Sequence, residues 1–153
     1  MANGRVEGIY IAPDKGAPMQ RFETATLLWN RGIEGDRYCA GRGSFPGKRH
    51  VTIINHRFIA GTPWEHIHRR NLVISGIELM YAFGREHHAL IRIGENVRLK
   101  LIKYCDPCER PGKLSGVLGM KKALQDCGGV IAQVIIGGVI RVGDEVIVKP
   151  KGY

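Results

Sequence analysis

Two cysteines three residues apart, Cys105 and Cys108, carry the most obvious chemistry in this sequence. They bound the run CDPC at 105–108, which ends a stretch of alternating apolar and polar residues. Such a pair can form half of a zinc site, act as a redox couple, or present a reactive thiolate to a soft metal or to sulfur. Nearby Lys103 and Arg110 favour the thiolate form. We expect both thiols to be partly exposed at the edge of the fold.

The residues around this motif leave the alternatives open. A zinc site needs two further ligands, and Cys39, Cys127 and the histidines at 87–88 are available, but there is no second C-x-x-C motif. A thioredoxin-like pair expects a helix to follow, whereas Pro111 and Gly112 would break one. By itself the motif therefore fits zinc binding, a redox pair, a reactive thiolate, or a buried inert pair.

A glycine-rich segment at 32–43 is a second candidate. It holds Gly35, Asp36 and Arg37. Exposed backbone amides beside an arginine suit a phosphate, so the segment could form an anion-binding loop. It lacks the GKS or GKT ending of a P-loop, which argues against a nucleotide triphosphatase. The alternative is a surface loop with local ion pairs.

A third candidate is the pair Arg69 and Arg70, which directly precede a predicted strand beginning at Asn71. The guanidinium group presents a fork of donors that matches phosphate oxygens and stays charged. The alternative is a solvated helix end, where cations meet the negative end of the helix dipole. We interpret most of the six histidines as surface or structural residues.

The elements that would position these residues are mostly short strands. Hydrophobic periodicity predicts strands at 5–12, 24–28, 50–55, 71–75, 96–104, 130–136 and 139–149, with a hairpin turn at Gly137 and Gly138. Short helices are predicted at 62–70 and 118–126. Many strands with few helices predict an all-β fold, mainly β with a few short helices and resembling a β-barrel.

Composition bounds the class of protein. The 153 residues include 23 basic and 14 acidic ones, for a net charge of +9. This length fits one domain, 1–153, and the apolar share of 44 % argues against disorder. No apolar run is long enough to cross a membrane, and no secretory leader is visible. We expect a cytoplasmic protein with reduced thiols, no membrane association and anionic partners.

Taken in order, these segments resemble the MOSC domain, the C-terminal domain of molybdenum-cofactor sulfurases, which also occurs as small stand-alone bacterial proteins. The matching runs are GIEGDRY at 32–38, RHVTII at 49–54, RRNLVISG at 69–76, IGENVRLKL at 93–101, CDPC at 105–108 and GGVIRVGDEVIV at 137–148. They extend over residues 32–148. The resemblance implies a β-barrel-like domain, in agreement with the predicted strands.

The resemblance also implies a cofactor and a site. It implies binding of the molybdenum cofactor, a molybdenum–pterin (molybdopterin), with Cys108 as molybdenum ligand or as sulfur carrier. Arg70 and Asn71 would lie near the phosphate end of the pterin. The other implied cofactor-binding residues are Gly35, Asp36, Arg37 and Arg49. Relatives often carry an acidic residue after the RxVTxI strand, where this chain has NHR at 55–57, so an acidic proton donor is not expected there.

The implied activity is the reduction of N-hydroxylated small molecules, or sulfur or cofactor transfer. The sequence shows no flavin, haem or iron–sulfur motif, so a separate electron donor or cysteine desulfurase is expected as partner. No covalently bound pyridoxal phosphate is expected. The alternative class is a non-enzymatic β-barrel, either zinc-stabilised or basic and RNA-binding. Nucleic acid is the less favoured partner, because the strands lack aromatic residues at alternate positions among the basic ones.

Overall fold

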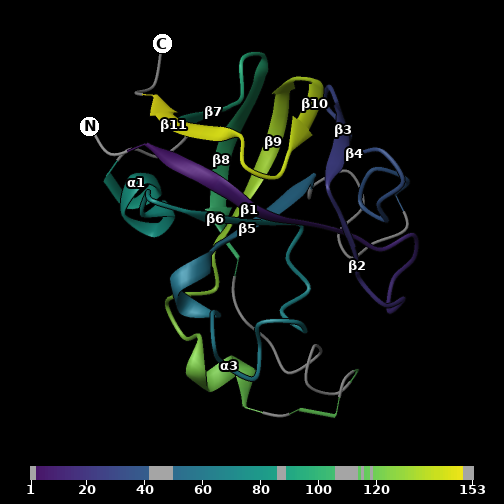
Figure 1. The fold of residues 1–153 in the computed structure, drawn as a ribbon, viewed down its shortest axis with the longest axis vertical. Coiled ribbons are helices and arrows are strands. Elements are labelled where there is room, and N and C mark those ends of the chain that lie inside the picture. Colours follow the sequence, from purple (N-terminus) through teal and green to yellow (C-terminus); the bar gives the residue numbers. More distant parts are fainter. Residues whose placement is uncertain are drawn as a thin grey trace.

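In the computed structural model, which describes residues 3–41, 50–85, 89–105, 114, 116–117 and 119–149, seven of the described strands close into a β-barrel (Figure 1). They are β1 (Gly4–Ile11), β5 (Val51–Asn55), β6 (Leu72–Ser75), β7 (Leu90–Ile93), β8 (Val97–Tyr104), β9 (Val130–Ile136) and β11 (Glu145–Lys149). Their order is β11-β7-β8-β9-β5-β6-β1, and β1 pairs back onto β11. Only β5 and β6 pair in parallel among these neighbours. The predicted β-barrel fold class is confirmed.

A smaller sheet lies beside the barrel. It consists of β3 (Thr24–Leu28), β4 (Gly32–Ile33) and β10 (Gly138–Arg141) in the order β10-β3-β4, while β2 (Gln20–Phe22) extends the barrel from β1. The predicted hairpin at Gly137 and Gly138 is wrong, because β10 pairs with β3 and not with β9. The predicted strand at 139–149 is two strands, β10 and β11, separated by a turn at Gly143. Turn residues indicate a change of direction, but they do not indicate which strand the following strand pairs with.

Two apolar clusters hold the fold together. The larger one fills the barrel, with inward side chains such as Ile53, Leu72 and Leu99. The smaller one lies outside the barrel, where Ile54 of β5 and Val73 of β6 pack with α3 (Met120–Ala123). Every residue of β5 is therefore buried, because both of its faces are covered. Figure 1 shows α3 below the barrel.

The helices differ most from the sequence-based expectations. The helix predicted at 62–70 is wrong: this segment forms successive turns, and Arg69 adopts a left-handed φ of 56° that no α-helix contains. The helix predicted at 118–126 is confirmed over Met120–Ala123. The sequence analysis missed α1 (Leu79–Arg85), whose first amide donates to Asn55 Oδ1 at 3.0 Å, and the 3₁₀ turn η1 (His56–Phe58). No described helix is long and apolar enough to cross a membrane.

Candidate anion-binding site at Arg70

Arg70 is a buried cation whose donors are only partly used. The residue is 6 % exposed, and its Nε donates to the Gly128 carbonyl at 2.8 Å while Nη1 donates to the His68 carbonyl at 3.2 Å. Its Nη2 is buried and has no hydrogen-bond partner among the described residues. A buried charge without a counter-ion is costly, and so is a buried donor without an acceptor. The free Nη2 therefore marks a position that an anion would stabilise.

His68 holds the backbone of Arg70 in place. Its Nδ1 accepts the Arg70 amide hydrogen at 2.9 Å, so the neutral ring carries its own proton on Nε2. The ring packs edge-on against Tyr10, with centroids 4.9 Å apart. Burial, together with a smaller effect of the positive charge of Arg70, lowers the pKa of His68 to about 3. His68 is thus a neutral acceptor at ordinary pH. No sequence pattern distinguished it from the other histidines.

The turn at Gly128 and Gly129 joins Arg70 to the cysteine motif. Gly128 accepts the Arg70 Nε hydrogen, and Gly129 accepts the amide hydrogen of Cys105 at 2.9 Å. Gly129 has a φ of 95°, and a Cβ there would lie 2.0 Å from the Ile53 carbonyl oxygen. Only glycine fits such a close approach of two backbones. The turn thus brings together the start of the cysteine motif and a buried arginine from a distant part of the chain.

Of the two cysteines of the motif, the structure describes only Cys105. Cys105 is a free thiol and only 2 % exposed. The expectation of a partly exposed thiol is therefore wrong for Cys105, because the end of β8 passes beneath the Gly129 turn. Cys108 lies outside the described residues, as does Arg49.

Asn71 connects three strands beside this site. It is fully buried, and its Nδ2 donates to the Tyr10 carbonyl at 3.1 Å. Its Oδ1 accepts the Thr52 amide hydrogen at 3.0 Å. These bonds tie the start of β6 to β1 and β5. Asn71 thereby fixes the place where the chain leaves Arg70 and enters the barrel.

The glycine-rich segment is folded inward at Asp36. This fully buried carboxylate accepts the amide hydrogens of Ala12 at 3.1 Å and Tyr38 at 3.2 Å, and it pairs with Arg37 Nη1 at 3.2 Å. Burial raises the pKa of Asp36, whereas the charge of Arg37 and a hydrogen bond to Asn71 act in the opposite direction. Arg37 is itself buried and also donates to the Tyr38 hydroxyl at 3.1 Å. Its charge is thus balanced within the segment.

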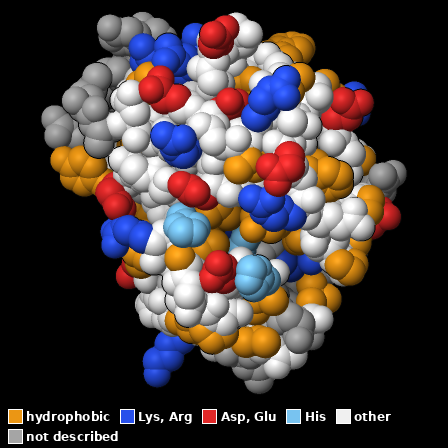
Figure 2. All heavy atoms as spheres, viewed as in Figure 1, with side chains coloured by type: hydrophobic (Ala, Val, Ile, Leu, Met, Phe, Trp, Pro, Cys, Tyr) orange, Lys and Arg blue, Asp and Glu red, His pale blue; other side chains and the backbone are white. Residues whose placement is uncertain are grey.

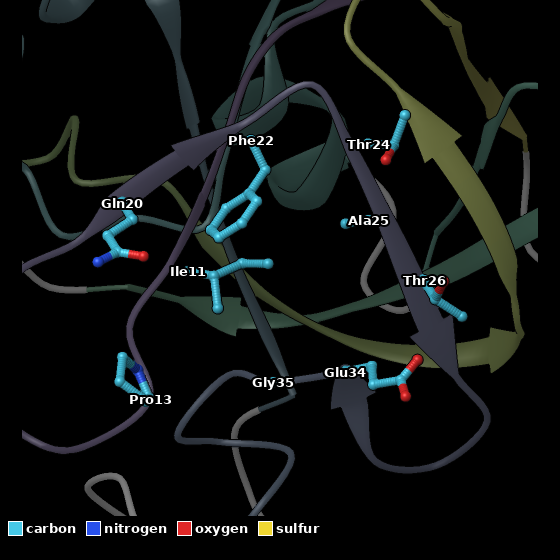
Figure 3. Close-up of a pocket in the computed structure, with 9 residues that line it drawn as sticks. All are labelled: Ile11, Pro13, Gln20, Phe22, Thr24, Ala25, Thr26, Glu34 and Gly35. Carbon is cyan, nitrogen blue, oxygen red and sulfur yellow. The ribbon is translucent and has the colours of Figure 1, made fainter.

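Gly35 lies on the surface, at the margin of a hollow of about 400 Å³ (Figure 3). The hollow is lined by Ile11, Pro13, Gln20, Phe22, Thr24, Ala25, Thr26, Glu34 and Gly35. Figure 3 shows the Phe22 ring extending over Ile11, with Glu34 on the opposite side below Thr26. The hollow thus combines an apolar floor with a carboxylate and hydroxyl groups, and Gly35 at its margin directly precedes Asp36.

The structure therefore brings together part of the site that the sequence predicted. Arg70 and Asn71 are consecutive and buried, and Asp36 and Arg37 form a buried ion pair. The described residues contain no cluster of three or more His, Cys, Asp or Glu side chains able to hold a metal ion. The sequence analysis missed the contacts of His68, Gly128 and Gly129. Neither residue type has a spacing that would have revealed its long-range contact.

These features define a class of protein: a closed β-barrel with a buried, incompletely paired arginine next to a C-x-x-C segment. The model of the MOSC domain matches residues 49–147. The chain belongs to the MOSC domain family.

Solved structures share the fold. The YuaD protein from Bacillus subtilis matches with a TM-score of 0.77 and 19 % identity, over 97 % of this chain and 96 % of that chain. YiiM from Geobacillus stearothermophilus matches with a TM-score of 0.68 and 11 % identity, over 97 % of this chain and 76 % of that one. YiiM from Escherichia coli matches with a TM-score of 0.57 and 15 % identity, over 97 % of this chain and 69 % of that one. No curated protein matches the chain.

Proposed function

We propose that this chain is a cytoplasmic protein that binds the molybdenum cofactor, with Arg70 holding its phosphate end and Cys108 as molybdenum ligand or sulfur carrier. The convergence of Arg70 and Cys105 on the Gly128 and Gly129 turn carries the proposal. A phosphate offers the acceptor that Arg70 Nη2 lacks. Membership of the MOSC family supports this choice of anion.

The distances along the chain are compatible with one site for both groups. Cys108 follows Cys105 by three residues, which span at most about 11 Å when extended. Cys105 is held at Gly129, next to the residue that accepts from Arg70. A thiolate is a suitable ligand for a soft or sulfur-bearing metal centre. The buried residues fit the anionic end of the cofactor, and Cys108 supplies the thiolate.

The bound cofactor would supply the redox chemistry, for which we propose N-hydroxylated small molecules as substrates. The hollow at Glu34 and Phe22 is a place for such a molecule, because it combines an apolar floor with hydrogen-bonding groups. Electrons would come from a separate donor protein. In the alternative role of sulfur carriage, a cysteine desulfurase would load Cys108. Both roles need the same arginine and the same thiolate.

Cofactor retention tests the anion site. The Arg70→Met and Arg69→Met variants are purified from a molybdenum-replete host, and their pterin and molybdenum contents are measured. We expect Arg70→Met to weaken retention by about 1.5–3 kcal/mol, the range for a charge-assisted hydrogen bond. Arg69→Met is the matched control, because Arg69 instead donates to the Ala17 carbonyl at 2.7 Å. Unchanged pterin content in folded Arg70→Met would contradict the proposal.

The cysteine pair tests the assignment of the thiolate. Cys108→Ser should lose activity with a hydroxylaminopurine or an amidoxime and a chemical reductant, whereas Cys105→Ser should retain it. Because Cys105 is buried, Cys105→Ser should melt at a lower temperature than the parent protein. Stoichiometric zinc, lost equally from both variants, would favour a zinc site instead. If the molybdenum-loaded parent shows no turnover, sulfur or cofactor carriage becomes the better assignment.

A further inference from the structure

Neighbouring strands of the barrel present positive charge on one outward face. The register places Arg92 of β7 opposite Arg98 of β8, and Leu90 opposite Lys100. On the other side of β7, Ile147 and Lys149 of β11 face Arg92 and Leu90. The intervening residues, such as Ile91 and Leu99, point into the core. We call the outward set the basic strip: Leu90, Arg92, Arg98, Lys100, Ile147 and Lys149.

Among the described residues, the two arginines of the basic strip, Arg92 and Arg98, have few neutralising partners. Among the outward positions of these described strands, the one carboxylate is Glu145, which pairs with Arg92 Nη2 at 3.2 Å and also accepts from Asn3 at 2.7 Å. The Arg92 Nε is buried without a hydrogen-bond partner in the described part of the chain. Arg98 donates to the backbone carbonyls of Glu95 and Val97 at 3.2 and 3.3 Å. Two arginines therefore face each other, and the one carboxylate beside them pairs with Arg92.

This arrangement costs stability in the isolated chain. Like charges directly opposite on antiparallel strands destabilise the pair. By contrast, the face shown in Figure 2 mixes acidic and basic side chains. An outside partner that brings negative charge to the basic strip would remove the repulsion.

We propose that the basic strip is the docking surface for an acidic protein whose contact region also contains apolar side chains. Leu90 and Ile147 are half-buried between the cations, and apolar side chains flanked by arginine are typical of protein interfaces. A second copy of this chain would bring like charge and be repelled. Single-stranded nucleic acid is bound by sheets that carry stacking aromatic residues, and the outward residues of the basic strip include none. This inference is independent of the cofactor site.

Titration with a defined acidic probe tests the docking surface. The full chain, labelled with ¹⁵N, is titrated with a synthetic peptide of eight glutamates and three interspersed leucines, and the amide shifts and Kd are measured. Arg98→Glu/Lys100→Glu is compared with Lys121→Glu/Lys122→Glu, which changes the net charge equally at exposed positions of α3. We expect shifts along β7, β8 and β11. The strip variant should weaken binding about tenfold or more, and the α3 variant much less.

Three results would overturn the inference. The first is equal weakening in both double variants, which would show that net charge alone drives binding. The second is tighter binding of an oligothymidine of matched charge, with shifts on the same strands, which would assign the basic strip to nucleic acid. The third is concentration-dependent self-association that the strip variant abolishes, which would assign it to a second copy.

Discussion

Arg70 and Arg92 each bury one guanidinium nitrogen without a described hydrogen-bond partner, but their surroundings differ. Arg70 is 6 % exposed and is held by the carbonyls of Gly128 and His68, with no carboxylate among its described contacts. The Arg92 side chain is 28 % exposed and pairs with Glu145, which also accepts a hydrogen bond from Asn3. The same residue type therefore lies in two different surroundings. An enclosed charge suits one small anion, whereas a half-exposed row of charges suits an extended surface.

The buried His68 makes the stability of the Arg70 region depend on pH. His68 has a folded-state pKa of about 3, below its ordinary value of 6.5, so its contribution to stability is complete above pH 6.5 and is lost as the pH falls toward 3. We expect this loss to reach roughly 4–5 kcal/mol. Burial also lowers the pKa of His50, which acts in the same direction. The free energy of unfolding, measured by urea titration between pH 7 and 3.5, checks this expectation.

His68→Asn is the matched variant for this measurement. The Asn Oδ1 can accept the Arg70 amide hydrogen in place of the His68 Nδ1. Asparagine does not titrate, so the variant should show a shallower loss of stability below pH 6.5. Identical pH profiles for the two proteins would remove His68 as the source of the effect.

Two glycines with similar φ angles, one in each region, differ in how closely other atoms pack around them. Gly129 has a φ of 95° and a close backbone neighbour, while Gly143, in the turn before β11, has a φ of 97° and open space around it. We expect Gly129→Ala to destabilise the fold by about 3 kcal/mol or more, and Gly143→Ala by about 1 kcal/mol. Thermal unfolding of both variants measures the difference. Equal losses would mean that the close contact at Ile53 adds nothing.

A smaller effect is expected from two asparagines. Asn71→Ala leaves the Thr52 amide and the Tyr10 carbonyl without their buried partner, which should cost about 2 kcal/mol. Asn96→Ala, at an exposed position in the turn between β7 and β8, should change the free energy of unfolding by less than about 0.5 kcal/mol. Chemical denaturation of the two variants tests whether polar contacts matter more at the Arg70 region. Similar values would contradict that contrast.

The smallest expected effect has the opposite sign. Arg98→Glu replaces a like-charge pair with Arg92 by an attractive one, so it should stabilise the fold by about 0.2–1 kcal/mol at low salt. Arg98→Gln, which only removes the charge, should give a smaller gain. The melting temperatures at low and high salt report both gains. A destabilised Arg98→Glu would show that the local bonds of Arg98 outweigh the repulsion.

The sequence predicted the barrel largely because strand alternation is a local property. β3 and β9 have their predicted ends, and β1, β5, β6 and β8 differ by a residue or so. The missed elements, β2, β4, β7 and α1, are short and give little periodicity. The helix predicted at 62–70 failed because Arg69 adopts a left-handed conformation, for which this arginine gave no signal.

The properties of the candidate site also divide into those that are local in the sequence and those that depend on the tertiary structure. The sequence by itself determined that Arg70 and Asn71 precede a strand and that the C-x-x-C motif follows one, since both statements concern adjacent residues. Only the tertiary structure decided that Arg70 is buried against Gly128, that Cys105 is enclosed, and that His68 is neutral. These properties depend on water being excluded by segments up to 58 residues away. Burial and the pairing of charge arise only when the barrel closes.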